Sequence, residues 1–150
     1  EDVLDKIDGL LDIAKDHNKL IKRIENINIK DMLSTLEVLE EKDEFNFYRT
    51  STKYSIDIKN FIDQFFVNYN KKVVIMLEIE LAKPMLGLVV SKDIAESINA
   101  GKVIQNIAKE VNCGGGGPKH FGTAEFGDLK LYNKAKNNLR KCIEEINFGS

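Results

Sequence analysis

Four consecutive glycines, Gly114 to Gly117, constrain the fold of this chain more than any other feature, because glycine destabilises the interior of helices and strands. They belong to residues 113–128, which read CGGGGPKHFGTAEFGD and lie between two stretches of helical periodicity. We therefore expect a glycine-rich loop over residues 113–128, whose ends are held by the flanking helices. Such a loop can expose backbone amides beside Lys119 and His120, which indicates a site for an anionic ligand. A flexible hinge is the alternative interpretation of the glycines.

The charges of the chain are distributed unevenly along it. Hydrophobic residues make up 43% of the 150 positions, as expected for a globular domain, and the formal net charge is only −2. Residues 1–42 hold eleven acidic and seven basic side chains, a net of −4, whereas residues 100–141 hold eight basic and three acidic ones, a net of +5. The carboxy-terminal part is therefore the part that can attract a polyanion.

The sequence offers few of the groups that metal sites or covalent catalysis require. Its two cysteines, Cys113 and Cys142, lack zinc-ligand spacing, and we expect a reduced, cytoplasmic protein. With only two histidines, His17 and His120, we expect neither a metal centre nor a Ser-His-Asp triad. The glycines fit neither the dinucleotide-binding nor the P-loop motif, and we expect no signal peptide and no membrane span. Because the chain starts at Glu1 in helical pattern, we expect a fragment of a longer protein.

Residues 1–42 have the apolar spacing of a helix, and we expect them to form a helical oligomerisation arm. A short coiled coil and an amphipathic helix that packs on its own domain both fit this pattern. A second periodic stretch, from Ile29 to Leu39, predicts continued helix, and the acidic residues that follow mark the expected boundary of the arm. In a heptad frame, one seam position holds Ile7, Ala14 and Ile21, and the other holds Leu10, His17 and Ile24.

Residues 43–150 predict a globular α+β domain, in which a small mixed or antiparallel sheet packs against helices and carries the glycine-rich loop. The expected strands are residues 44–54, 73–81 and 85–90, of which the last two form an antiparallel hairpin. The expected helices are residues 58–69, capped by Ser55 or Asp57, then residues 94–111 and 129–146. Cys142 lies on the apolar face of the last helix, where we interpret it as a packing residue.

Glu78 and Glu80 are a pair of carboxylates that could be considered for catalysis. They lie two residues apart on the strand of residues 73–81, on the face opposite its apolar side chains. Because no further acid or histidine accompanies them, we expect them to lie on a solvent-exposed sheet face.

Binding is the activity that these residues favour. Glycine amides, the point charge of Lys119, and the side chains of His120 and Phe121 could together hold the backbone of a nucleic acid, aided by basic residues of the flanking helices.

The helix and loop resemble the C-terminal domain of alanyl-tRNA synthetases. Residues 98–111 read INAGKVIQNIAKEV, and GGGGP and FGTA follow, whereas that family typically shows an AGKLIKEIAK-like helix, a polyglycine loop, a proline and a small-residue segment. The order of the upstream elements agrees as well. Gly122 stands where the family usually has alanine, and Glu125 and Phe126 stand in place of its paired glycines.

This resemblance implies a noncatalytic module that binds the outer corner of tRNA, dimerises through its helical arm, and supports aminoacylation and editing by its parent enzyme. It implies no cofactor in this fragment, since the ATP, Mg²⁺ and Zn²⁺ of the parent would lie outside this chain, and no metal site. The residues implied to contact nucleic acid are Gly114, Gly115, Gly116, Gly117, Pro118, Lys119 and His120 in the loop, with Lys102 and Lys109 on the preceding helix.

Two alternatives remain open. The same domain type is similar to the substrate-binding domain of DHH-type phosphoesterases, including single-strand exonucleases, which usually carry a Gly-Gly-His sequence. Here Pro118 and Lys119 separate Gly117 from His120, so the synthetase resemblance is the better match. The other alternative is a protein-interaction module, in which the arm binds a partner helix and the glycine loop is a hinge.

Overall fold

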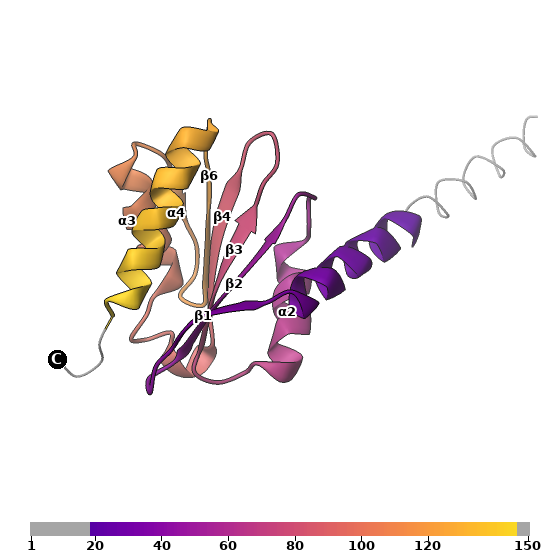
Figure 1. Cartoon of the computed structure of the whole chain (residues 1–150), viewed down its shortest axis with the longest axis horizontal. Coiled ribbons are helices and arrows are strands. Elements are labelled where there is room, and N and C mark those ends of the chain that lie inside the picture. The colour runs from indigo at the N-terminus through magenta and orange to yellow at the C-terminus, as the bar shows by residue number, and fades with distance from the viewer. Residues whose placement is uncertain (1–18, 147–150) are drawn as a thin grey trace, which may run out of the picture.

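The computed structural model describes residues 19–146, and within them a six-stranded sheet forms the centre of the molecule (Figure 1). The strands lie in the order β1-β2-β3-β4-β6-β5, with β2 and β3 parallel and every other neighbouring pair antiparallel. The α+β class and the mixed sheet are therefore confirmed. The strands are β1 (Glu37–Glu41), β2 (Asn46–Thr52), β3 (Val73–Ile79), β4 (Met85–Val90), β5 (Gly115–Gly116) and β6 (Phe121–Glu125).

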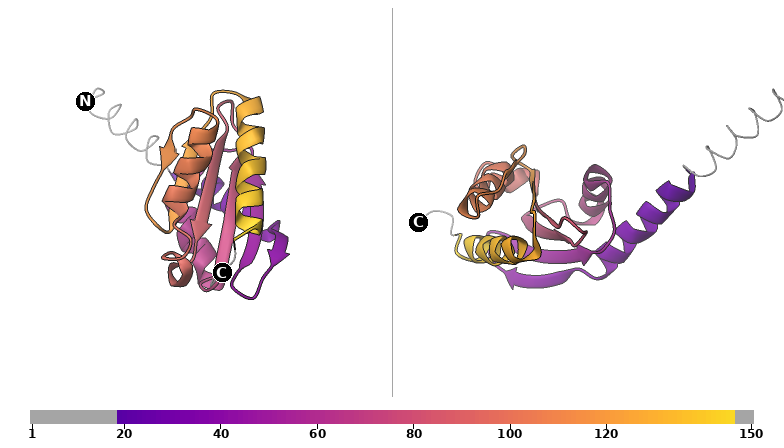
Figure 2. Two further views of the ribbon diagram at one scale, coloured as in Figure 1. Left: turned by 90° about the vertical axis from the view of Figure 1, so that its left-hand side faces the viewer. Right: turned by 90° about the horizontal axis from the view of Figure 1, so that it is seen from above.

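Helices cover both faces of this sheet, as the view from above in Figure 2 shows. Helices α3 (Ala100–Glu110) and α4 (Leu129–Glu144) pack on one face, and α2 (Ile58–Asn68) packs on the other. A 3-10 turn, η1 (Lys92–Ile94), leads from β4 towards α3. Residues 19–34 are also helical, and their last turns join the α2 layer while the preceding turns extend away from the sheet (Figure 1).

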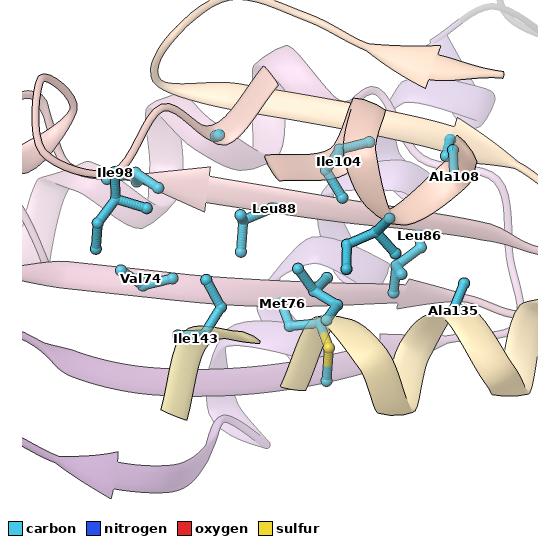
Figure 3. Close-up of a cluster of buried hydrophobic side chains, with 14 of the residues drawn as sticks. Val74, Met76, Leu86, Leu88, Ile98, Ile104, Ala108, Ala135 and Ile143 are labelled. Carbon is cyan, nitrogen blue, oxygen red and sulfur yellow. The ribbon is translucent and has the colours of Figure 1, made fainter. Parts of the chain in front are cut away.

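Strand β3 is buried along its whole length, because helices cover it on both sides. Its side chains alternate, so Val74 and Met76 enter the core under α3 and α4, while Ile75 and Leu77 enter the core under α2. Burial of each such side chain stabilises the fold by about 1.5–3 kcal/mol. Figure 3 shows the first of these cores, where Val74, Met76, Leu86 and Leu88 of the sheet meet Ile104 and Ala108 of α3 and Ala135 and Ile143 of α4.

The parallel pair β2 and β3 is joined by α2, and this unit follows the sequence closely. Asp57 caps the helix, since its carboxylate accepts hydrogen bonds from the amides of Lys59 and Asn60 at 3.0 and 3.4 Å. Phe61 and Phe65 stack on the buried side of α2, with ring centroids 5.9 Å apart. The predicted strand, cap and helix of this unit are thus confirmed.

The prediction that helix continues to Leu39 is wrong. Helical structure ends at residue 34, and residues 37–41 form strand β1, which pairs with the free edge of β2 and contains a β-bulge between Val38 and Glu40. A short apolar pattern fits both structures, and the available hydrogen-bonding edge decides between them. The heptad positions before residue 19 lie outside the described residues, so the coiled-coil arm stays a prediction.

The boundary expected between residues 42 and 43 also falls inside a packed region. Ile29 and Met32, on the last turns of the helix, are 0% and 1% exposed, and the hydroxyl of Thr50 donates to the carbonyl of Met32 at 2.9 Å. Lys42, in the turn between β1 and β2, donates to the carbonyls of Glu144 and Ile146 at the end of α4. The described part of the arm therefore contacts the domain on both sides of the sheet, in the α2 layer through Ile29 and Met32 and at the end of α4 through Lys42.

The prediction of an irregular loop over residues 113–128 is wrong for its second half. Residues 121–125 form β6, which lies inside the sheet between β4 and β5, with Gly122 opposite Leu88. Its buried residues under α3 are the small ones, Gly122 and Ala124. The strand therefore lacks the large apolar side chains at alternate positions by which most strands are recognised in a sequence. The helix before it starts at Ala100, later than expected, because Asn99 is its cap.

The prediction that Glu78 faces solvent is wrong as well. Helix α4 packs over that face of the sheet, and Glu78 is 0% exposed, whereas Glu80, just beyond the end of β3, is exposed. Arg49 and Lys136 neutralise the buried carboxylate, which makes its burial possible.

Candidate functional site

The glycine segment lies directly against the first turn of α3, and the two backbones touch. A Cβ atom added to Gly101 would lie 1.8 Å from the carbonyl oxygen of Gly117, and one added to Gly122 would lie 2.8 Å from the carbonyl oxygen of Ala100. Gly117 itself has a φ of +155°, which side chains rarely adopt. The glycines on both sides of this contact are therefore explained by close packing of a helix on a sheet edge.

The amides at the start of α3 are used inside the protein. The amide of Ala100 donates to the carbonyl of Lys119 at 2.8 Å, and the amide of Gly101 donates to the carbonyl of Pro118 at 3.0 Å. The amide of Lys102 donates to the Oδ1 of Asn99 at 3.1 Å. Because these donors already have partners, the α3 N-terminus does not offer them to an anion.

Gly115 and Gly116 form β5, the short edge strand that pairs with Ala124 and Thr123 of β6. Gly114 differs from these glycines, since a Cβ atom added to it would meet nothing within 4 Å and its backbone is exposed. Gly114 belongs to the residues expected to contact nucleic acid, and packing does not require a glycine at its position.

The side chains of Pro118, Lys119 and His120 lie on the outside of the tight turn before β6. The Nζ of Lys119 lies 2.7 Å from the Oε1 of Glu96, in an ion pair that is exposed on both sides. The ring of His120 meets the ring of Phe121 edge to face, with centroids 5.1 Å apart. Lys119 is thus accessible, but a ligand at this position would compete with Glu96 for its charge.

Lys102 and Lys109 are both exposed on α3, seven residues and therefore about two turns apart, so they share one face of the helix. Helix α4, which covers the same face of the sheet, adds further exposed cations. We call these side chains the basic surface: Lys102 and Lys109 of α3, Lys119, and Lys130, Lys134, Arg140 and Lys141 of α4. The sequence predicted Lys102, Lys109 and Lys119 as one group, and the fold adds the α4 cations to the same side of the sheet.

A groove of about 510 Å³ lies between α3 and α4. Asn138 bridges its walls by donating to the Oε2 of Glu110 at 3.1 Å, and burial raises the pKa of the Cys142 thiol, with smaller contributions from Glu110 and Glu145. Cys142 is therefore a half-buried wall residue that packs against the core, as expected from its apolar face. Sequence reasoning missed the groove, because its walls come from two helices separated by β5 and β6. It is lined by Val103, Asn106, Ile107, Glu110, Asn138, Lys141, Cys142, Glu145 and Ile146.

Residues 19–146 contain neither a metal-binding cluster nor a membrane-spanning helix. Among these residues, three or more histidine, cysteine, aspartate or glutamate side chains nowhere gather in a way that could hold a metal ion. None of the helices described in this range combines the length and apolar character needed to cross a bilayer.

Comparisons with solved structures identify the fold. No family model matches the sequence, and no curated protein matches it either. The C-Ala domain of Aquifex aeolicus alanyl-tRNA synthetase is similar to this chain, with a TM-score of 0.54 and 20% identity, over 68% of this chain and 94% of that domain.

Two larger proteins have similar structures as well. One is a DHH-domain member of the s1p family of ribosomal proteins, with a TM-score of 0.61 and 14% identity over 88% of this chain. The other is the pGpG-specific phosphodiesterase PggH of Vibrio cholerae, with a TM-score of 0.51 and 13% identity over 87% of this chain. This chain covers 33% and 42% of those two proteins. At these identities the comparisons establish the fold alone, which is similar to that of the C-Ala domain and to parts of the two larger proteins.

Proposed function

We propose that this chain is the C-terminal module of an alanyl-tRNA synthetase and that it binds the outer corner of tRNA without catalysing a reaction. The observation that supports this proposal most is the basic surface, which α3 and α4 present on a fold that covers 94% of a C-Ala domain. Phosphate groups supply most contacts when proteins position a folded RNA without reading its sequence.

In this proposal the side chains of α3 and its connection to β6 make the contacts. Lys102 and Lys109 neutralise phosphates along one face of α3, and Lys119 and His120 extend that row at the helix start. Gly114, Gly115, Gly116, Gly117 and Pro118 shape the backbone that brings Lys119 and His120 against α3. Because the first α3 amides are bonded internally, the cations carry more of the binding than the glycine amides.

The remaining parts of the proposal concern the parent protein. The helical arm would pair two copies into a homodimer, and the parent, a cytoplasmic enzyme, would bind ATP, Mg²⁺ and Zn²⁺ outside this chain. Leu20, Ile21, Ile24 and Ile27 support the arm pairing, since they are 44–64% exposed on the helix of residues 19–34.

The test is a fluorescence anisotropy titration of labelled tRNA at several salt concentrations. We expect weak binding that falls with salt, and we expect Lys102→Gln with Lys109→Gln to reduce the slope of log K against log salt by about 1.5. The matched control is Lys59→Gln with Lys71→Gln, which removes the same charge near α2 on the opposite face of the sheet. Absence of tRNA binding at low salt, or an equal loss in both double variants, would contradict the proposal.

A second candidate is the substrate-binding domain of a DHH-type phosphoesterase. It is favoured by the TM-score of 0.61 and the 88% coverage of this chain in the comparison with a DHH-domain protein. Titration of the chain with the dinucleotide pGpG separates the two candidates. Saturable pGpG binding that Lys119→Gln weakens, without measurable tRNA binding, would favour the phosphoesterase.

A further inference from the structure

A buried carboxylate lies where α4 packs over the sheet, on strand β3. Glu78 is 0% exposed and pairs with Arg49 of β2, whose Nη2 donates to the Oε1 at 3.0 Å and whose Nε donates to the Oε2. The Nζ of Lys136, on α4, lies 3.2 Å from the same Oε1. Hydrogen bonds to Glu78 and, to a smaller extent, to Glu37 raise the pKa of Arg49 further above its usual range.

A cavity of about 220 Å³ opens beside this cluster. It reaches solvent at Asn137 and Arg140, which are exposed on α4. Its charged lining consists of three cations and a single carboxylate, which the nearest two cations already neutralise. The lining residues are Arg49, Met76, Glu78, Lys136, Asn137 and Arg140.

The cavity lining has more hydrogen-bond donors than the described residues use. Arg49 has five N–H groups, of which Glu78 and Glu37 engage three. Arg140 donates from its Nε to Glu144 at 3.0 Å, which leaves the four N–H groups of its Nη atoms. A cluster of spare guanidinium donors around a small opening has the chemistry that binds a tetrahedral oxyanion.

Tyr132 of α4 lies beside this cluster and carries a buried hydroxyl. It is 0% exposed, and within the described residues its hydroxyl has no hydrogen-bond partner. Lys136 links it to the cavity, because the Nζ that contacts Glu78 also lies 5.2 Å from the centroid of the Tyr132 ring. A buried hydroxyl without a partner costs about 1–3 kcal/mol in general, and native proteins usually satisfy it with a protein group or an ordered water.

We propose that this cavity, between α4 and strands β2 and β3, binds a phosphate group, either free or at the end of a nucleotide. Arg140, Lys136 and Asn137 contact the phosphate oxygens, and Arg49 faces them from the floor. Glu78 is a positioning residue, because it holds Arg49 and Lys136 in place without contacting the ligand. This site shares Arg140 with the basic surface but lies apart from the α3 contacts, and phosphate binding here does not depend on the proposed binding of tRNA.

The test is an NMR titration of the full chain with inorganic phosphate at constant ionic strength, with chloride as the reference anion. We expect saturable shifts of Asn137 and Arg140 side-chain signals, with a dissociation constant on the order of 1 mM. Arg140→Gln should weaken binding about fivefold or more. Lys141→Gln is the matched control, since it removes the same charge from the next residue of α4 but lines the groove with α3.

Titration with AMP and adenosine distinguishes a nucleotide phosphate from a free phosphate. The same measurements separate a failure of this proposal from a failure of the proposed tRNA binding. Tighter binding of AMP than of phosphate, with no shift for adenosine, would assign the site to a nucleotide phosphate, whereas equal affinities would assign it to the phosphate group alone. Non-saturable shifts, or equal weakening by Arg140→Gln and Lys141→Gln, would overturn the proposal. Loss of tRNA binding with phosphate binding intact would contradict only the proposed function.

Discussion

Besides their shared apolar core, α3 and α4 each make a further contact with the sheet, and these two contacts use opposite means. At the first, α3 touches β5 and β6 through glycine backbones that leave no room for a side chain. At the second, α4 lies over β3 through a fully buried carboxylate and two cations. Backbone contact tolerates no added atom, whereas an ion cluster tolerates a change of shape but not the loss of one charge. The four predictions below test this difference.

The largest effect is expected for Gly101→Ala. Alanine normally stabilises a helix relative to glycine, by about 0.5–1 kcal/mol, but here its Cβ would lie 1.8 Å from the carbonyl oxygen of Gly117. We expect a loss of about 3 kcal/mol in the free energy of unfolding, measured by urea denaturation. Gly114→Ala, with nothing within 4 Å, should change it by less than about 0.5 kcal/mol. Equal stability of the two variants would show that the contact can relax.

Glu78→Gln is expected to follow, with a loss of about 2 kcal/mol in the free energy of unfolding. It leaves two cations without their buried partner, but Arg49 and Lys136 remain 31% and 26% exposed, so water compensates in part. Adding Arg49→Met and Lys136→Met to Glu78→Leu should recover most of this loss, because an apolar cluster needs no counter-charge. As a control, Glu37→Gln, at an exposed partner of Arg49, should cost less than about 0.5 kcal/mol.

Tyr132 gives a smaller effect that depends on pH. Burial, followed by the charge of Glu78, raises the pKa of its phenol, so the folded protein keeps a proton that the unfolded chain releases above about pH 10. Its contribution to stability is therefore complete below that pH and falls as pH rises, by up to about 1.4 kcal/mol per pH unit. Because its buried hydroxyl has no partner among the described residues, Tyr132→Phe should raise the stability at pH 7 by about 1 kcal/mol and should reduce this alkaline slope in thermal or urea unfolding. An unchanged slope would mean that the phenol is not buried in solution.

The smallest effect is expected for Lys119→Gln. Its ion pair with Glu96 is exposed, so the free energy of unfolding should change by about 0.5 kcal/mol or less. The same variant should weaken tRNA binding measurably, which separates a binding side chain from a structural one. A large loss of stability would instead assign Lys119 to the packing of the turn.

The sequence predicted the elements whose burial pattern repeats along one segment. Strand β3 and helices α2 and α4 have such patterns, and their expected positions agree with the structure to within a few residues. Strand β6 was missed, because its buried positions are Gly122 and Ala124, and their size serves the approach of α3. The glycine segment was expected to present amides to a ligand, but the same glycines are also what a close helix contact needs.

Burial of Glu78 could not be predicted from its neighbours in sequence. Its partners, Arg49 and Lys136, come from another strand and from the last helix, and only the sheet order brings them together. Exposure of Lys102 and Lys109 is compatible with binding of tRNA at the candidate site, but exposure alone does not test that binding. Their contact with tRNA stays a prediction.

The edges of the sheet have a consequence for the protein at high concentration. Within the described residues, one edge is β1, which contains a bulge and carries Glu37, Glu40 and Glu41, and the other edge is β5, which is two residues long. Neither presents a long, flat row of free backbone groups, and the carboxylates of β1 repel an identical strand. The folded domain therefore resists amyloid-like stacking of sheets, even where many copies are made close together.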